Sequence, residues 1–255
     1  MENNQIKAAI TGGVSGLGLA VARRFIADGG QVALLDVDES KAAAALAELG
    51  DRACFLAVDV SDEAAMREAL QKAVAHCAGL NVAVACAGVL GAGRALGRDG
   101  PLPLAAFRRT VDINLIGTFN LAKEAAAIMQ QQPADNDGER GVIVNTASIA
   151  AYEGQIGQAA YAASKGGIAG MTLPLAREFA RFGIRVVSVA PGVFHTPMVD
   201  TMPPEVQTAL AAGIPFPPRL GKPAEFADLV AHIVANSYIN GVTLRLDGAL
   251  RMQPK

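Results

Sequence analysis

The chain has 255 residues, of which 51% are hydrophobic, 18% are charged and 27 are glycine, with a formal net charge of −2. This hydrophobic content excludes an intrinsically disordered chain. The slight acidic excess argues against a protein that binds nucleic acid by neutralising phosphates. We therefore expect a folded globular protein without a nucleic-acid partner.

Signals for targeting, membrane insertion or disulfide formation are missing from the sequence. Residues 1–5 are polar and do not form a signal peptide, and no stretch of about 18 apolar residues is free of charge. Cys54, Cys77 and Cys86 have no CxxC spacing, which is typical of reduced thiols inside cells. No Cys/His cluster suits zinc. We expect a cytoplasmic protein with no metal site and no membrane partner.

Apolar runs typical of strands alternate with helical patterns along the whole chain. The predicted strands cover residues 6–11, 31–36, 53–58, 81–86, 142–148, 184–190 and 242–246. The predicted helices cover residues 17–27, 40–49, 61–77, 104–131, 159–182 and 223–236, and Ser61 is the expected N-cap of the third. The strands are continuously apolar, which indicates burial on both faces. We therefore expect one α/β domain over residues 1–255, a doubly wound, parallel, seven-stranded sheet with helices on both faces.

A glycine-rich turn, Thr11–Gly18, lies between the first predicted strand and the first predicted helix. Its glycines allow a tight turn close to a pyrophosphate, and the helix N-terminus offers free N–H groups to the anion. Asp36 ends the second strand, where its carboxylate can accept hydrogen bonds from ribose hydroxyls. Neither Ser15 nor Val37 is basic, so nothing nearby would bind a 2′-phosphate. The pattern predicts a dinucleotide site that favours NAD over NADP.

Three polar residues form the second pattern that points to chemistry. Ser148 is expected to end the fifth strand, and Tyr161 and Lys165 are spaced i,i+4 on one face of the helix 159–182. Taken alone, this pair is equally typical of a core tyrosine and a lysine that reaches solvent. Combined with a serine at a strand end and a dinucleotide turn, it indicates acid–base catalysis.

Together these motifs resemble the short-chain dehydrogenase/reductase family over essentially the full length of the chain. The matching elements are Thr11–Gly18, Ala87-Gly88, Asn114, Ser148, Tyr161–Lys165 and Pro191-Gly192. Residues 144–178, 215–225 and 245–254 are most similar to a subgroup that acts on 3-hydroxyacyl-CoA and hydroxysteroids. The resemblance implies reversible, NAD-dependent oxidation of a secondary alcohol, with 3-hydroxyacyl-CoA to 3-oxoacyl-CoA as the first choice. A hydroxysteroid or another apolar alcohol is the alternative substrate.

The resemblance also implies a catalytic tetrad of Asn114, Ser148, Tyr161 and Lys165. Tyr161 would act as general acid/base, with its pKa lowered by Lys165 and the nicotinamide charge. Lys165 would also hold the nicotinamide ribose, and Ser148 would orient the substrate oxygen. Asn114, in the helix 104–131, is expected to hold a water that links Lys165 to solvent.

Further residues are assigned to ligands by the same resemblance. Those expected at the cofactor are Gly12, Ser15, Gly16, Leu17, Gly18, Asp36, Asp59, Val60, Cys86, Ala87, Gly88, Tyr161, Lys165, Pro191, Gly192, Val193, Phe194 and Thr196. Those expected at the substrate are Ser148, Gln155 and Tyr161. One departure is Ala85, which stands where many family members have an asparagine that ties neighbouring strands together.

The segment 194–220 is apolar and rich in proline, and we expect it to form a lid over a hydrophobic substrate. Candidate cations for the phosphates of CoA are Arg94, Arg98, Arg219 and Lys222. Family likeness implies a homotetramer with interfaces on residues 104–131, 159–182 and the C-terminal strand and tail. Two alternatives from other classes remain. They are an NAD-binding scaffold or redox sensor without catalysis, and a methyltransferase, which would not need the Tyr161/Lys165 pair.

Overall fold

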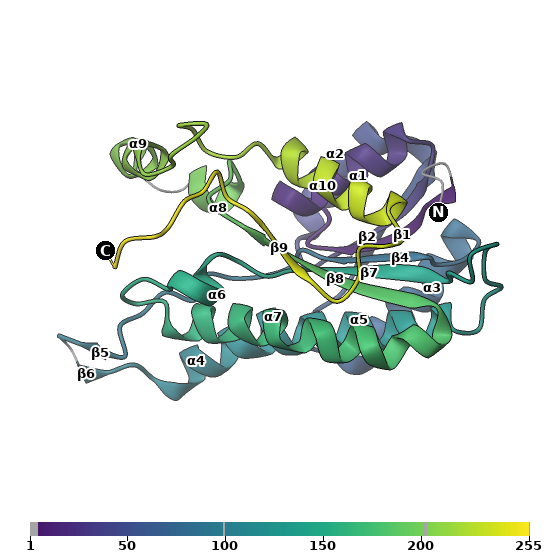
Figure 1. Cartoon of the computed structure of the whole chain (residues 1–255), viewed down its shortest axis with the longest axis horizontal. Helices are drawn as coiled ribbons and strands as arrows, with labels where there is room; N and C mark the ends of the chain where they lie inside the picture. Colours follow the sequence, from purple (N-terminus) through teal and green to yellow (C-terminus); the bar gives the residue numbers. More distant parts are fainter. Residues whose placement is uncertain (1–4, 99, 201–202, 255) are drawn as a thin grey trace.

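The computed structural model describes residues 5–98, 100–200 and 203–254, in which one sheet separates two layers of helices (Figure 1). The strands of this sheet are β1 (Lys7–Thr11), β2 (Gln31–Asp36), β3 (Ala53–Ala57), β4 (Val82–Ala85), β7 (Gly141–Thr146), β8 (Ile184–Pro191) and β9 (Thr243–Leu246). Their order is β3-β2-β1-β4-β7-β8-β9, and every neighbouring pair is parallel. The prediction of a parallel seven-stranded sheet is confirmed.

The two helical layers explain why the strands are apolar throughout. One face is covered by α1 (Gly16–Ala27), α2 (Glu39–Leu49) and α10 (Pro223–Ala235), and the other by α3 (Glu63–Cys77), α5 (Gly117–Met129) and α7 (Ala159–Phe179) (Figure 1). The order of the strands reverses between β1 and β4. In an open parallel sheet, such a reversal leaves a crevice at the carboxyl ends of the strands, where ligands bind.

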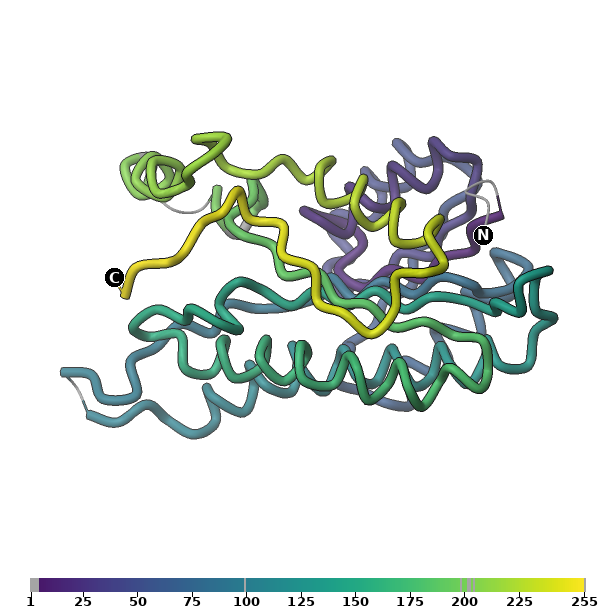
Figure 2. The backbone as a smooth tube through the Cα atoms, in the orientation of Figure 1, coloured from purple at the N-terminus to yellow at the C-terminus, as the bar shows by residue number. Residues whose placement is uncertain are grey.

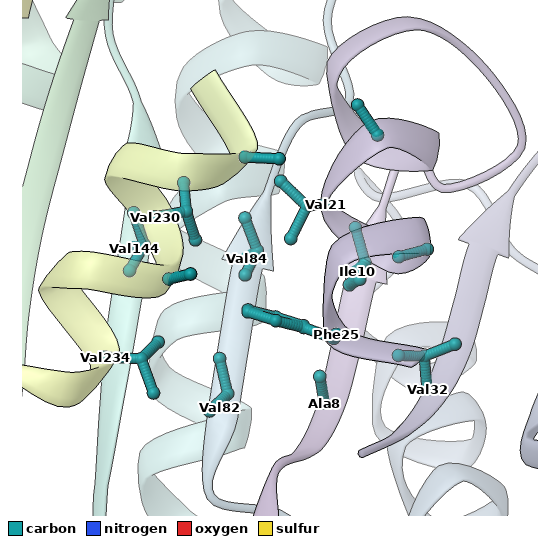
Figure 3. Close-up of a cluster of buried hydrophobic side chains, with 14 of the residues drawn as sticks. Ala8, Ile10, Val21, Phe25, Val32, Val82, Val84, Val144, Val230 and Val234 are labelled. Atoms are coloured by element: carbon teal, nitrogen blue, oxygen red, sulfur yellow. The ribbon is translucent and has the colours of Figure 1, made fainter. Parts of the chain in front are cut away.

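The core under α1 and α10 shows how side chains alternate between the two faces. Ala8 and Ile10 of β1 point toward α1, where they meet the fully buried ring of Phe25, and valines of α10 complete the cluster (Figure 3). Ala9, between them in sequence, belongs to the core on the opposite face. Complete burial of a ring such as Phe25 contributes roughly 2–3 kcal/mol to stability. Both layers are therefore held to the sheet by apolar packing.

Two predicted helices differ from the structure. Residues 104–131 do not form one helix, because α4 (Leu104–Val111) and α5 are separated by a π-helical turn, Asp112–Ile116. The N-cap of α3 is Asp62 and not Ser61, since the Asp62 carboxylate accepts a hydrogen bond from the Ala65 N–H at 3.0 Å. The Ser61 hydroxyl instead donates to the Asp59 carboxylate at 2.7 Å.

Several short elements in the connections were not predicted. A small antiparallel pair, β5 (Leu96–Gly97) and β6 (Gly100–Pro101), lies before α4, and α6 (Ala150–Glu153) lies before α7. The predicted lid contains α8 (Pro197–Asp200) and α9 (Pro204–Ala212), and its residues 201–202 lie outside the described residues. Both helices begin at a proline, a residue that indicates a loop in the sequence but suits the first turn of a helix. Short 3₁₀ turns follow α2 (Gly50–Arg52) and α7 (Ala180–Phe182).

None of the helices in the described part of the chain has the length and apolar character needed to cross a membrane.

Candidate active site

The carboxyl ends of the strands open into a cavity of about 640 Å³. This volume lies within the range typical of ligand and cofactor sites. Of the residues expected in the tetrad, at the cofactor or at the substrate, all except Asn114 line the cavity: Gly12, Ser15, Gly16, Leu17, Gly18, Asp36, Asp59, Val60, Cys86, Ala87, Gly88, Ser148, Gln155, Tyr161, Lys165, Pro191, Gly192, Val193, Phe194 and Thr196. Segments distant in sequence therefore meet in one place, as the motifs predicted.

The glycine-rich turn has no room for side chains at two positions. Gly12 has a φ of +64°, and a Cβ added there would lie 2.8 Å from the Ala87 nitrogen. A Cβ on Gly18 would clash with the Gly12 carbonyl oxygen. Helix α1 begins at Gly16 without a side-chain cap bond or an acidic residue in its first turn, so its first N–H groups face the cavity unneutralised. The turn fits the pyrophosphate of a dinucleotide.

The ends of β1 and β4 are joined by Thr11, which the sequence analysis did not single out. Its hydroxyl accepts hydrogen bonds from the N–H groups of Cys86 and Ala87, at 3.2 and 3.3 Å. Ala85 pairs in register with Asn145, whose buried side-chain amide has no partner among the described residues. The side chain of Ala85 cannot supply one, which agrees with the expected absence of a tie at this position.

The carboxylate of Asp36 lies at the end of β2, beside the glycine-rich turn. It accepts hydrogen bonds from the N–H groups of Asp38 at 3.1 Å and Val14 at 3.4 Å, which orient it at the cavity wall. Among the described residues that line the cavity, the basic ones are Arg109 and Lys165, and they lie on α4 and α7 rather than near Asp36. This end of the cavity therefore suits ribose hydroxyls better than an additional phosphate.

Ser148 does not end the fifth strand of the sheet, because β7 stops at Thr146 and Ser148 lies two residues further, at the turn into α6. Its hydroxyl oxygen accepts a hydrogen bond from the Ala150 N–H at 3.1 Å, and the hydroxyl lies near enough to the Tyr161 phenol to lower the pKa of that group. The turn thus places the serine hydroxyl against α7, within the cavity.

Tyr161 and Lys165 lie on one face of α7, with the Lys165 Nζ 5.8 Å from the centre of the Tyr161 ring. The Lys165 ammonium group donates to the Thr146 carbonyl at 2.7 Å, and burial lowers its pKa to about 8. Burial raises the pKa of Tyr161, and the hydrogen bond with Ser148 offsets part of this increase. In the chain by itself, burial therefore outweighs the hydrogen bond with Ser148 and disfavours the phenolate. The expected lowering of this pKa by Lys165 together with the nicotinamide charge stays a prediction.

Asn114 lies in the π-helical turn and is fully buried behind the cavity wall. Its Oδ1 accepts from the Val89 N–H at 2.8 Å, while its Nδ2 donates to the Val89 carbonyl at 2.9 Å and to the Ser164 hydroxyl at 3.1 Å. A Cβ added to Gly88 would lie 3.1 Å from the Asn114 Oδ1 and 3.7 Å from the Lys165 Nζ. Asn114 therefore clamps the loop after β4 beside Lys165.

The predicted rim cations do not line the cavity, and Arg219 is already held by Glu225 through bonds of 2.6 and 3.0 Å. Instead the cavity is lined by Arg109, which pairs with no carboxylate among the described residues. Arg109 and Ile113 both line the cavity at i,i+4 spacing. Counting back from Asn114 by three or four positions gives Val111 and Thr110, so helical spacing from the predicted site residue did not point to Arg109 or Ile113. No group of three or more potential metal ligands exists in the described part of the chain.

A family model described as short chain dehydrogenase matches residues 7–207. The chain belongs to the short-chain dehydrogenase/reductase family. It is 49% identical over 249 residues to 3-hydroxyacyl-CoA dehydrogenase type-2 from Bos taurus, which covers 97% of this chain and 95% of that protein. The protein of the same name from Homo sapiens is also 49% identical, with the same coverage.

A solved structure agrees with these relatives. The crystal structure of 3-hydroxyacyl-CoA dehydrogenase type-2 from Mycobacterium avium superposes with a TM-score of 0.93 at 45% identity, covering 97% of this chain and 96% of that one. This short-chain dehydrogenase/reductase is thus an oxidoreductase with a Rossmann-type fold.

Proposed function

We propose that this short-chain dehydrogenase/reductase reversibly oxidises the hydroxyl group of a 3-hydroxyacyl-CoA to the ketone, with NAD as the hydride acceptor. The observation that carries the proposal is the convergence of Ser148, Tyr161 and Lys165 on one cavity with the glycine-rich turn. The names of relatives that are 49% identical support the choice of an acyl-CoA substrate.

The choice of NAD rests on the residues at the carboxyl ends of β1, β2 and β4. Gly12 and Gly18 leave space that a side chain would fill, and the free N–H groups of α1 suit the pyrophosphate. The Asp36 carboxylate would accept hydrogen bonds from the adenosine ribose and repel a 2′-phosphate. Asp59, Val60 and residues 86–88 would border the adenosine, while residues 191–194 and Thr196 would border the nicotinamide. Bound NAD would supply the hydride acceptor.

In the proposed mechanism, Tyr161 takes the proton of the substrate hydroxyl during oxidation and returns it during reduction. Ser148 hydrogen-bonds the substrate oxygen and orients it toward Tyr161, and Gln155 lines the same region. Lys165 holds the nicotinamide ribose, and below its pKa of about 8 it carries a positive charge that favours the tyrosine phenolate. Asn114 keeps the loop after β4 in place and holds the water that connects Lys165 with solvent.

The walls beyond Ser148 are apolar and suit an acyl chain. Ile149, Val193, Val199, Leu210 and Met252 line this part of the cavity. The same walls suit a hydroxysteroid, which is the second candidate substrate. Arg109 favours the acyl-CoA, because an unpaired cation at the cavity matches the phosphates of CoA and has no counterpart in a steroid.

We further propose that residues 194–220 act as a lid, since this segment contributes Phe194, Val199 and Leu210 to the cavity.

A homotetramer and a cytoplasmic location are part of the same proposal. The oligomer is supported by apolar side chains that are exposed within residues 104–131 and 159–182, among them Ile116, Phe119 and Leu173. Exposed apolar side chains that lie together are typical of surfaces that bind another protein chain. Light scattering of the purified protein would measure the mass of the assembly.

The test is a substrate panel with purified protein, in which NADH or NADPH formation is followed for 3-hydroxybutyryl-CoA and for a hydroxysteroid. We expect the highest kcat/KM for the acyl-CoA with NAD. Turnover of the steroid without turnover of any acyl-CoA would overturn the choice of substrate, and a preference for NADP would overturn the choice of cofactor.

The substitution Arg109→Gln tests whether Arg109 binds the CoA part of the substrate. We expect KM for the acyl-CoA to rise about tenfold through loss of a charge-assisted hydrogen bond, with KM for the steroid unchanged. Arg108→Gln is the matched control, since Arg108 is exposed on the same helix and does not line the cavity. If both substitutions changed KM equally for both substrates, Arg109 would have no role in binding CoA.

A further inference from the structure

The C-terminal strap, residues 247–254, leaves the sheet after β9 and runs between two parts of the substrate side of the cavity. One part is the turn between α6 and α7, and the other is the segment that carries α8 and α9 (Figure 2). The strap forms neither helix nor strand. Its conformation therefore depends on contacts made by side chains.

Glu153, the last residue of α6, is the main anchor of the strap. Its two carboxylate oxygens accept hydrogen bonds from the two terminal nitrogens of Arg245, at 2.8 and 3.1 Å. The same carboxylate accepts from the Met252 N–H at 3.3 Å and lies 3.4 Å from the Arg251 Nε. A bidentate pair of this kind fixes orientation as well as distance.

Arg245 extends this anchor along the strap. Its Nε donates to the Asp247 carboxylate at 2.7 Å, and its Nη2 also donates to the Leu250 carbonyl at 3.1 Å. Asp247 in turn accepts from the Ala249 N–H at 3.0 Å. The turn at the start of the strap is thus held by one guanidinium group that is itself held by Glu153.

A second attachment connects the strap to a residue that lines the cavity. The Gln155 side-chain Nε2 donates to the Gln253 carbonyl at 3.0 Å, and the Ile156 N–H donates to the Pro254 carbonyl at 3.0 Å. Because Gln155 lines the cavity, the strap sets the position of a side chain that faces the substrate.

The other side of the strap packs against the proposed lid. Leu250 is buried in a cluster with Ile149 and Ile214, which also includes Val199 and Leu220. Met252 packs against this cluster and lines the cavity. The strap therefore contributes a side chain, Met252, to the apolar wall of the cavity.

We propose that the C-terminal strap determines which substrates fit, with Met252 in contact with the far end of the acyl chain and Glu153 as the positioning residue that holds Met252 there. The inference rests on the proposed function for the identity of the chain that Met252 meets. A thioether side chain suits this place, because it is apolar and adapts its shape to its neighbours.

The experiment measures kcat/KM for a series of 3-hydroxyacyl-CoA substrates of increasing chain length. Met252→Ala opens the wall, so we expect the ratio of kcat/KM for the longest to the shortest substrate to rise about tenfold. Glu153→Gln keeps the shape but loses the charge, so the same ratio should rise by a smaller factor. Met252→Leu restores an apolar side chain of similar volume and should retain the wild-type ratio.

Controls separate a role in specificity from a role in folding. Glu178→Gln, at an exposed carboxylate of α7, should leave every value unchanged. The Kd for NADH, measured by fluorescence, should be the same in all variants, because the strap does not border the glycine-rich turn. Hydrogen exchange at residues 250–254 should become faster in Glu153→Gln, which reports loss of the anchor directly.

The outcomes distinguish this inference from the proposed function. Wild-type turnover of acyl-CoA substrates with unchanged ratios in Met252→Ala and Glu153→Gln would overturn the role of the strap alone. If the wild type oxidises no acyl-CoA, the proposed function fails. The role of the strap is then tested with the apolar alcohols that the protein does oxidise. The quantity compared is again the ratio of kcat/KM for the largest to that for the smallest substrate.

Discussion

The nucleotide side of the cavity, at the ends of β1, β2 and β4, is formed mainly by glycines and backbone groups, whereas the substrate side, at the ends of β7 and β8, is formed by side chains. On the nucleotide side, a Cβ added to Gly12 or Gly18 would collide with neighbouring backbone. On the substrate side, Glu153 and Met252 meet across 99 positions of sequence, and Arg245 joins them from a third segment.

This difference predicts how each side responds to mutation. Backbone in contact with backbone cannot move aside, so an added methyl group on the nucleotide side has to displace the turn itself. Apolar side chains on the substrate side can exchange volume with their neighbours, as cores do when total volume is kept. A single added methyl group on the nucleotide side should therefore cause a large loss of cofactor affinity. Substitutions of apolar residues on the substrate side should instead shift substrate selectivity by smaller steps. Loss of an acid–base residue is the exception, because it removes the chemistry itself.

Tyr161→Phe is the substitution with the largest expected effect, because it removes the proposed acid/base and leaves the shape of the site almost unchanged. We expect kcat to fall about 1,000-fold, in the range typical of general acid–base catalysis. The Kd for NADH should stay within about twofold of wild type. Steady-state kinetics and a fluorescence titration measure the two quantities. Tyr238→Phe, at a side chain that is 98% exposed, is the control, and retained turnover in Tyr161→Phe would contradict the mechanism.

Gly18→Ala tests the nucleotide side. The new methyl group would lie 2.8 Å from the Gly12 carbonyl carbon and would clash with its oxygen, so the turn has to shift. We expect the Kd for NADH to rise about 100-fold, as displacements of this size do elsewhere. Gly166→Ala is the control, since its methyl group would come no closer than 3.8 Å to the Ala151 carbonyl oxygen. Circular dichroism shows whether the variants fold, and wild-type affinity in a folded Gly18→Ala would contradict the comparison.

Lys165→Met tests the electrostatics of the substrate side. Burial lowers the pKa of Lys165 from 10.5 to about 8, so between these values the unfolded chain binds more protons than the folded one. Stability therefore rises with pH in this window. Between pH 8 and pH 10 the wild type should gain about 2 kcal/mol of unfolding free energy relative to Lys165→Met. Urea denaturation at several pH values measures this gain. Parallel pH profiles would show that burial does not shift the pKa of Lys165.

Asp36→Asn has the smallest expected effect, since it removes a charge at the edge of the nucleotide side without blocking it. We expect the ratio of kcat/KM with NAD to kcat/KM with NADP to fall about tenfold, through loss of repulsion of the 2′-phosphate. Asp38→Asn is the matched control, because that carboxylate pairs with Lys41 and does not line the cavity. An unchanged ratio in Asp36→Asn would show that Asp36 does not determine the choice between NAD and NADP.

Much of the fold was predictable because burial on both faces leaves a direct trace in the sequence. The segment 31–36 was predicted with the boundaries that β2 has in the structure. The first residue of a helix could not be predicted where two adjacent residues are both suited to cap it. Ser61 and Asp62 are both good N-cap residues, and only the bond to the Ala65 N–H decides between them. The π-helical turn around Asn114 keeps nearly helical periodicity, so the sequence did not separate α4 from α5.

The residues expected at the site divide in the same way. The glycine-rich turn, Asp36, Ser148, Tyr161 and Lys165 were predicted because they lie together at or near expected strand ends or on one helix face, and the structure brings them into one cavity. Arg109 lies five positions before Asn114, which is not a helical spacing, so the sequence did not mark it as a site residue. Met252, in the C-terminal strap, and Leu210, on α9, carry no signal of their own, because an apolar side chain at a ligand is indistinguishable in sequence from ordinary packing.

The sequence by itself determined the parallel sheet, the family resemblance and the local chemistry of the turn and of α7. These depend on residues within a few positions of one another and on backbone preferences that hold in any protein. Only the tertiary structure decided which segments close the substrate side, where Glu153, Arg245 and Met252 meet, and how burial shifts the pKa values of Tyr161 and Lys165. Those properties depend on distances between segments and on exclusion of water, which exist only once the chain has folded.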